Sequence, residues 1–179
     1  MTHTQPHYGG TMKKHVISSF LCISLVLITV QPAVARSQKE FIDSQNGYAI
    51  SHPSTWEASI YRSGIVVANI NSPDQKSGLQ IRILNLKKPI KKFVRDYTDD
   101  FKKSMKAVFL DQGKLESGSF NGYWVTFRSD RSGKQYFLKS YIIPTGDSRI
   151  FVFQSGVPSE QKSAGEKILD SIASSFRLR

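Results

Sequence analysis

The stretch GYWVTFRSDRSGKQYFLKSYIIPTGDSRIFVFQ, residues 122–154, contains three runs rich in aromatic and β-branched side chains. These runs, at 122–128, 135–143 and 149–154, have the composition of β-strands. Between them lie two short clusters of Asp, Ser and Gly, which are residue types that favour tight turns. Three strands joined by such turns predict an antiparallel meander. Apolar and polar residues alternate in the first run, so we expect one packed face and one partly solvated face.

Four further runs of the same composition precede the meander, at residues 48–51, 55–61, 65–70 and 79–86. Turn-forming clusters containing Asn, Asp, Gly or Pro stand before the first of these runs and after the third. No internal repeat and no long Pro- or Gly-rich linker interrupts them. The sequence therefore predicts one domain built on a mostly antiparallel sheet.

Two segments have apolar residues at helical spacing instead. The first contains Ile90, Phe93, Val94, Tyr97, Phe101, Met105 and Val108, which share one stripe at about 100° per residue. Pro89 suits the first turn of this helix. The second segment contains Ala164, Ile168, Leu169, Ile172 and Phe176, and residues 158–160 are its expected start. The predicted fold class is α+β, an antiparallel β-sheet flanked by helices in an α-β-α sandwich. The residues expected to be buried against the sheet are Phe93, Tyr97, Phe101, Ile168, Ile172 and Phe176.

Composition limits the class of protein. The 179 residues include 25 Lys and Arg against 14 Asp and Glu, a formal net charge of +11. Apolar residues make up 39% of the chain and charged residues 22%. These values exclude a multi-spanning membrane protein and a wholly disordered chain. They are typical of a single soluble domain with a basic surface.

The N-terminal segment has the pattern of a secretory signal peptide. Lys13 and Lys14 precede an apolar run at 16–30, and Ala33-Val34-Ala35 follows as a cleavage motif. We therefore expect residues 1–35 to be removed near Ala35, residues 36–179 to form the mature domain, and the protein to be periplasmic or otherwise extracytoplasmic. Whether translation starts at Met1 or Met12 stays open. The single cysteine, Cys22, lies in the removed segment, so no disulfide is expected.

Two motifs resemble a known family. Residues 46–56, NGYAISHPSTW, combine a glycine, an aromatic residue, a strand and a Pro-x-x-Trp ending, and residues 168–176, ILDSIASSF, form a terminal helix with a Ser-Phe finish. Both are similar to PsbP-like domains, the superfamily that also holds Mog-type Ran-binding proteins and bacterial DcrB-like proteins. The resemblance implies their α+β fold and a role as an extracytoplasmic accessory or assembly factor. The photosynthetic members have metal-associated histidines, whereas His52 is the one histidine after residue 35 here, so we do not expect a photosystem role.

Catalytic patterns are missing from the sequence. One histidine and no cysteine in the mature chain leave no His-His zinc pair and no Cys-His couple. His52 is interpreted as a partly exposed turn residue, and Asp130 and Asp147 as turn residues without calcium. Asp96, Asp99 and Asp100 are interpreted as a solvated helix face, and Trp56 and Trp124 as core anchors. We therefore expect no enzyme activity, no cofactor and no metal.

The first predicted helix carries an excess of positive charge. Lys91, Arg95, Lys102 and Lys106 fall at roughly 100° to 160° from Ile90, next to the apolar stripe. This stripe is the predicted binding site for an unidentified envelope protein or an anionic surface, and it allows peripheral membrane association. Nucleic acid is not expected as a partner of an exported protein. The alternative is a small-molecule or lipid-binding protein with a pocket between the sheet and the first helix, lined by Phe93, Tyr97, Phe101 and Trp124.

Overall fold

The computed structural model describes residues 37–61, 64–117 and 120–179. The predicted signal peptide and its cleavage site after Ala35 lie outside these residues. Within the described part of the chain, neither helix is long and apolar enough to cross a membrane.

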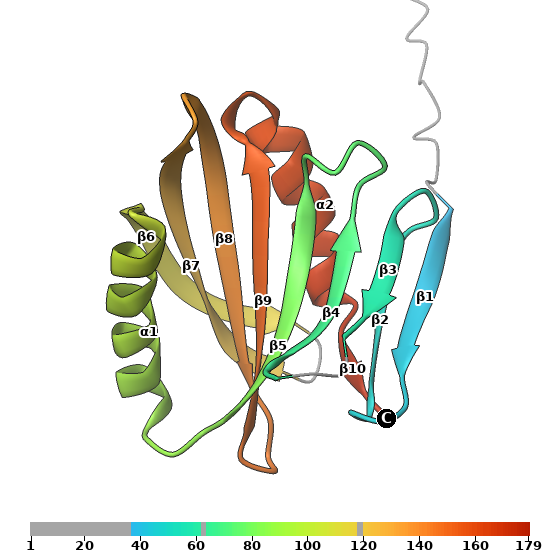
Figure 1. Ribbon diagram of the computed structural model, residues 1–179. Coiled ribbons are helices and arrows are strands. Elements are labelled where there is room, and N and C mark those ends of the chain that lie inside the picture. Colours follow the sequence, from blue (N-terminus) through green and yellow to red (C-terminus); the bar gives the residue numbers. More distant parts are fainter. Residues whose placement is uncertain (1–36, 62–63, 118–119) are drawn as a thin grey trace, which may run out of the picture. The chain divides into compact units, whose positions relative to one another are not determined.

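A seven-stranded antiparallel sheet forms the centre of the domain (Figure 1). Its strand order is β3-β4-β5-β9-β8-β7-β6, and all neighbours are antiparallel. The strands are β3 (Glu57–Ile60), β4 (Val66–Asn71), β5 (Gly78–Asn85), β6 (Val108–Ser117), β7 (Phe120–Arg131), β8 (Lys134–Pro144) and β9 (Arg149–Pro158). The predicted meander corresponds to β7, β8 and β9 and is confirmed.

A second, three-stranded sheet has the order β1-β2-β10 and is also antiparallel. Its strands are β1 (Gln38–Asp43), β2 (Tyr48–Pro53) and β10 (Arg177–Leu178). The run at 48–51 corresponds to β2, whereas β1 and β10 were not predicted from the sequence. In β1 only Phe41 and Asp43 are buried, so this strand lacks the apolar composition on which strand prediction depends.

Helix α1 (Ile90–Met105) begins directly after Pro89, as expected. It ends earlier than predicted, because Lys106 adopts a left-handed conformation with φ of 49°. Val108 is therefore the first residue of β6, and its placement in the helix was wrong. Helix α2 (Lys162–Ser174) follows the short 3₁₀ turn η1 (Ser159–Gln161), close to its predicted start.

The two helices cover opposite faces of the seven-stranded sheet (Figure 1). On the α2 face, Phe151 and Phe153 of β9 pack in the same cluster as Leu169 and Ile172, and the three-stranded sheet adds Tyr48 and Ile50. On the α1 face, the alternate residues Ile150 and Val152 pack with Val94, Phe101 and Phe127. The predicted burial holds for Phe101, Ile172 and Phe176, whereas Phe93, Tyr97 and Ile168 are only half-buried.

Candidate functional site

Helix α1 covers only part of its face of the sheet. It packs against β6 and β7 and in one cluster with Ile150 and Val152 of β9, whereas residues of β4, β5 and the second half of β9 line an open space beside it. The space between α1 and these strands is a cleft of about 920 Å³, which we call the inner cleft. A concave site of this size is the usual place for a ligand to bind.

Three amide side chains cross the floor of the inner cleft. Asn69 of β4 stands opposite Gln80 of β5, and Gln80 stands opposite Gln154 of β9. We call these three residues the amide row. Directly opposite residues of antiparallel strands have neighbouring side chains on one face. The row therefore places three neutral, half-buried polar groups side by side, with the buried Ser140 of β8 next in line.

The Tyr97 hydroxyl connects α1 to this floor. Gln154 Nε2 donates a hydrogen bond to the Tyr97 hydroxyl oxygen at 2.8 Å, and the same hydroxyl is 2.8 Å from Ser140 Oγ. Burial raises the pKa of Tyr97, so its hydroxyl stays neutral at physiological pH. This network fixes the helix at a set distance from the polar floor.

Asn69 and Gln80 have different hydrogen-bond environments. Gln80 Oε1 accepts a hydrogen bond from Arg82 Nε at 3.0 Å. Asn69 Oδ1 is buried and has no hydrogen-bond partner in the described part of the chain. A buried acceptor without a donor is costly, so this oxygen is a candidate to accept a hydrogen bond from a ligand.

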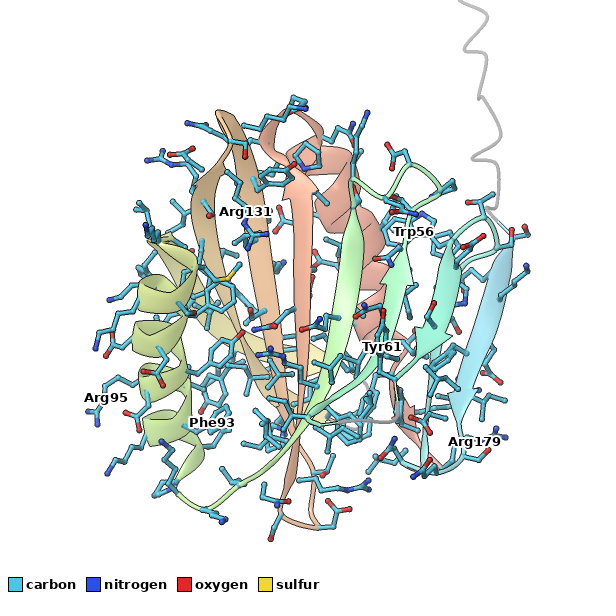
Figure 2. The ribbon with its side chains drawn as sticks, viewed as in Figure 1. Trp56, Tyr61, Phe93, Arg95, Arg131 and Arg179 are labelled. Carbon is cyan, nitrogen blue, oxygen red and sulfur yellow. The ribbon has the colours of Figure 1, made fainter. Side chains whose placement is uncertain are left out.

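Aromatic rings form the helical wall of the inner cleft. The rings of Phe93 and Tyr97 are stacked with centroids 6.2 Å apart, and those of Tyr97 and Phe101 are 5.7 Å apart. Phe93 points from α1 toward the sheet (Figure 2). The cleft thus combines an apolar aromatic wall with a polar floor.

Charged side chains stand at the edge of this wall. Lys88 forms an ion pair with Asp96, and this hydrogen bond holds the pKa of the Asp96 carboxyl below its ordinary value. Arg131 Nη2 donates to Met105 Sδ at 3.4 Å, beside the last turn of α1. Asp96 and Asp100 line the inner cleft and Asp99 lines the hollow on the other side of α1, so the three acids do not share one face. Asp99 and Asp100 are exposed, as expected of solvated residues, whereas Asp96 is half-buried.

Two glycines leave part of the cleft floor without side chains. Gly78 and Gly156 stand opposite each other on β5 and β9, one step along from the amide row. A Cβ atom at Gly78 would lie 2.4 Å from Asn71 Oδ1, and one at Gly156 would lie 3.1 Å from Leu138 Cδ2. The absence of side chains at this pair leaves room for a ligand and for the Asn71 amide.

The predicted basic stripe borders a different cleft. Lys91, Arg95 and Lys102 line a hollow of about 480 Å³ between α1 and β6, which we call the outer cleft. Its other walls include Phe109, Gln112 and Tyr123. Arg95 points away from the sheet, opposite in direction to Phe93 (Figure 2).

Lys106 does not join these three cations. It follows the end of α1 in the left-handed conformation and does not line the outer cleft. Within the stripe, Lys102 Nζ lies 2.9 Å from Asp99 Oδ1, and Arg95 Nε lies 3.7 Å from Asp96 Oδ1. The structure therefore brings together three of the four predicted partner-binding residues, each with exposed or half-exposed positive charge.

The tryptophans have separate positions. Trp56 is 7% exposed and belongs to the core on the α2 face, as predicted for an anchor. Trp124 packs on the same face, where its ring lies 5.5 Å from Lys139 Nζ. Trp124 therefore does not line the pocket beside α1, and its assignment to that pocket was wrong because its side chain lies on the face of the sheet opposite α1.

His52 and Asp147, two further residues considered from the sequence, take part in local hydrogen bonds within the fold. His52 lies in β2 and is only 4% exposed, so its predicted partial exposure was wrong, and its Nδ1 is 2.9 Å from the Pro53 carbonyl oxygen. Asp147 accepts hydrogen bonds from Thr145 Oγ1 and the Arg149 N–H, as expected of a turn residue. Among the described residues, no group of three or more His, Cys, Asp or Glu could hold a metal ion.

Solved structures share this fold. CyanoP, the cyanobacterial PsbP of Synechocystis, is 12% identical with a TM-score of 0.65, and the match covers 80% of this chain and 94% of CyanoP. The Saccharomyces cerevisiae Ran-binding protein Mog1p is 12% identical with a TM-score of 0.58, covering 80% of this chain and 96% of Mog1p. LpqN of Mycobacterium tuberculosis, which is involved in cell envelope biogenesis, is 12% identical with a TM-score of 0.55, covering 79% and 90%.

These likenesses confirm the fold expected from the two sequence motifs. At 12% identity they concern the fold alone. No protein-family model matches the sequence, and no curated protein sequence matches it either.

Proposed function

We propose that this domain, whose fold is PsbP-like, is a non-enzymatic accessory protein of the cell envelope that holds its ligand in the inner cleft. The single observation that carries this proposal is the juxtaposition of the amide row with the aromatic wall of α1 across about 920 Å³. Such a site has convergent polar groups for orientation and apolar surface for affinity.

The chemistry of the inner cleft favours binding over catalysis. Its floor offers amides and its wall offers rings and a neutral hydroxyl. These groups orient a ligand, but none of them exchanges protons readily near neutral pH. The ion pair of Lys88 and Asp96 is engaged within the protein.

Location in the envelope is supported by the signal-peptide pattern of residues 1–35. The fold neighbour LpqN is involved in cell envelope biogenesis, which agrees with a role of this kind. Accessory or assembly activity is also what the family resemblance implies.

The outer cleft supports a second candidate function, binding of an acidic envelope protein or an anionic surface. The observation in its favour is that Lys91, Arg95 and Lys102 border one hollow. Positive charges gathered in this way attract anionic partners over a distance set by the ionic strength. The two clefts lie on different sides of α1, so experiments on each can be kept separate.

The proposal is tested by thiol protection in producing cells. Cys22, the chain's one natural cysteine, lies in the predicted signal peptide, so a cysteine introduced into the domain is expected to be the one thiol of the exported protein. Gln80→Cys reports on the inner cleft, Arg95→Cys on the outer cleft, and Lys167→Cys on the exposed surface of α2 as a control. Each variant is labelled with a small maleimide in cells and after purification.

A ligand in the inner cleft should slow labelling of Gln80→Cys in cells at least fivefold relative to the purified protein. The rate for Lys167→Cys should be the same in both. If only Arg95→Cys is labelled more slowly in cells, the ligand binds in the outer cleft instead. Equal rates in cells and after purification at both cleft positions would contradict both candidates.

A further inference from the structure

We propose that the ligand of the inner cleft is a neutral oligosaccharide chain, bound through the amide row. This inference rests on the proposed function, because it assigns a chemical class to the ligand of that site. Three features of the cleft carry it: the donor and acceptor pattern of the floor, the aromatic wall, and the pairing of the nearby charges.

The floor matches the hydrogen-bonding pattern of sugar hydroxyls. A primary amide offers two donor hydrogens and one acceptor oxygen, and a hydroxyl is also both donor and acceptor. Asn69, Gln80 and Gln154 stand on three successive strands of the sheet, so they present this pattern as a repeated series. A chain of sugar units carries its hydroxyls as a repeated series as well.

The unpartnered oxygen of Asn69 is specific evidence for a donor in the ligand. Asn69 Oδ1 is buried without a hydrogen-bond partner among the described residues. A rotation of the amide that turns this oxygen into the cleft would let a ligand hydroxyl supply the missing hydrogen. A saturated hydrocarbon chain has no such group and would also leave the other amides of the row desolvated, so the floor does not suit a lipid tail.

The aromatic wall matches the apolar face of a sugar ring. A pyranose has a face made of C–H groups, and this face packs on aromatic rings. The Phe93 and Tyr97 rings are stacked, with an interplanar angle of 15°, and both line the inner cleft, so together they offer it apolar aromatic surface. Floor and wall together contact the hydroxyl edges and the C–H face of the same ligand.

The charges near the cleft favour a neutral ligand. Each cation that lines the cleft has a partner in the described part of the chain: Arg82 donates to Gln80 and Lys88 pairs with Asp96. Lys76 lies 3.9 Å from Asp74, and Arg131 donates to Met105 Sδ. A charged ligand would have to compete with these partners. In the outer cleft, Lys91 has no ion pair in the described part of the chain and Arg95 Nε lies 3.7 Å from its partner Asp96, so these cations are more available to an anion. A peptide that adds as a strand needs a sheet edge. The edge strands are β3 and β6, and the amide row lies on the face of inner strands.

The test is calorimetric titration of the purified protein with chitotetraose, cellotetraose and maltotetraose. Hyaluronan tetrasaccharide and phosphatidylglycerol vesicles serve as anionic comparisons. Asn69→Leu removes the unpartnered acceptor and breaks no hydrogen bond that the structure records for that side chain, so the variant should fold. Gln154→Leu is the second variant, and Lys91→Glu with Lys102→Glu on the outer cleft is the matched control.

We expect at least one neutral tetrasaccharide to bind, with affinity reduced tenfold or more by each amide variant and unchanged by the control. Thermal unfolding checks that each variant is folded. Failure of all three neutral sugars to bind, or binding that Asn69→Leu and Gln154→Leu leave unchanged, would overturn the inference. If Gln80→Cys is nevertheless protected in cells, the inner cleft remains the binding site and only the ligand class is wrong.

Discussion

Tyr97 of α1 and Gln154 of β9 are joined by a hydrogen bond of 2.8 Å that crosses the inner cleft from wall to floor. The helix is therefore attached to the sheet at the middle of the candidate site, in addition to its apolar packing on Val125 and Phe127. Gln154 also belongs to the amide row. The same residue therefore positions α1 and contributes to the surface that a ligand would contact.

Tyr97→Phe should weaken this attachment. The substitution leaves Gln154 Nε2 and Ser140 Oγ without the hydroxyl they contact, and a lost hydrogen bond of this kind costs about 1–2 kcal/mol of unfolding free energy. Chemical denaturation measures the change. Tyr123→Phe, at a half-buried tyrosine of β7, is the control and should cost less. Equal stability of Tyr97→Phe and the natural protein would show that the bond does not hold α1.

Lys139→Ala should loosen α2. Lys139 is 8% exposed, and its Nζ donates to Glu166 at 2.9 Å and to Asp170 at 2.7 Å. Removal of the cation leaves two carboxylates facing each other, at an expected cost of about 2–3 kcal/mol, below that of a fully buried pair because the Asp170 side chain is 46% exposed. Lys167→Ala on the exposed side of α2 is the control. A loss of less than about 1 kcal/mol of unfolding free energy in Lys139→Ala would contradict the role of Lys139 in holding α2 to β8.

The ion pair of Lys88 and Asp96 should make stability depend on pH in the acidic range. The Lys88 hydrogen bond lowers the pKa of Asp96 from its ordinary value of 3.8. A carboxyl with a lowered folded-state pKa stabilises the fold above the ordinary pKa, and this contribution is lost as the pH falls through the folded value. NMR titration of the Asp96 carboxyl should give a pKa below 3.8, and Lys88→Met should raise it. An unchanged pKa in Lys88→Met would contradict the assignment.

The outer cleft should bind anions only through the cations that border it. Lys91→Glu combined with Lys102→Glu should reduce binding to phosphatidylglycerol vesicles and weaken its salt dependence, whereas Lys106→Glu alone should have little effect. Exposed substitutions usually change stability by about 0.5 kcal/mol or less, so both variants should stay folded. Co-sedimentation at two salt concentrations measures this. An equal loss in Lys106→Glu would mean that net charge, not the cleft, determines binding.

Most elements were predictable because their signals are local. The helical spacing of Phe93, Tyr97 and Phe101 and the alternation in β7 both depend on a few neighbouring residues. β6 was missed because it is an edge strand with mostly exposed side chains and a bulge between Phe109 and Asp111. Its first residue, Val108, continues the helical spacing, and only the backbone of Lys106 shows that the helix has ended.

The candidate site was predictable only on its helical side. Phe93, Tyr97 and Phe101 follow from the stripe of α1, but the amide row depends on the register of β4, β5 and β9, and β9 lies far from the other two strands in the sequence. Local pattern does not give that register. The sequence does contain one local indication of a polar floor: Ser140 in β8 and Gln154 in β9 interrupt strongly apolar runs. Trp124 was misplaced because both faces of β7 are covered, so alternation does not indicate which helix lies on which face.

The central claim is that the natural ligand lies in the inner cleft. The most direct measurement is an NMR titration of the isotope-labelled protein with a soluble extract of the producing cell's envelope. We predict that the side-chain amide signals of Asn69, Gln80 and Gln154 shift, while the backbone signals of Lys91, Arg95 and Lys102 do not. Shifts confined to Lys91, Arg95 and Lys102, with the three amide signals unchanged, would contradict the account.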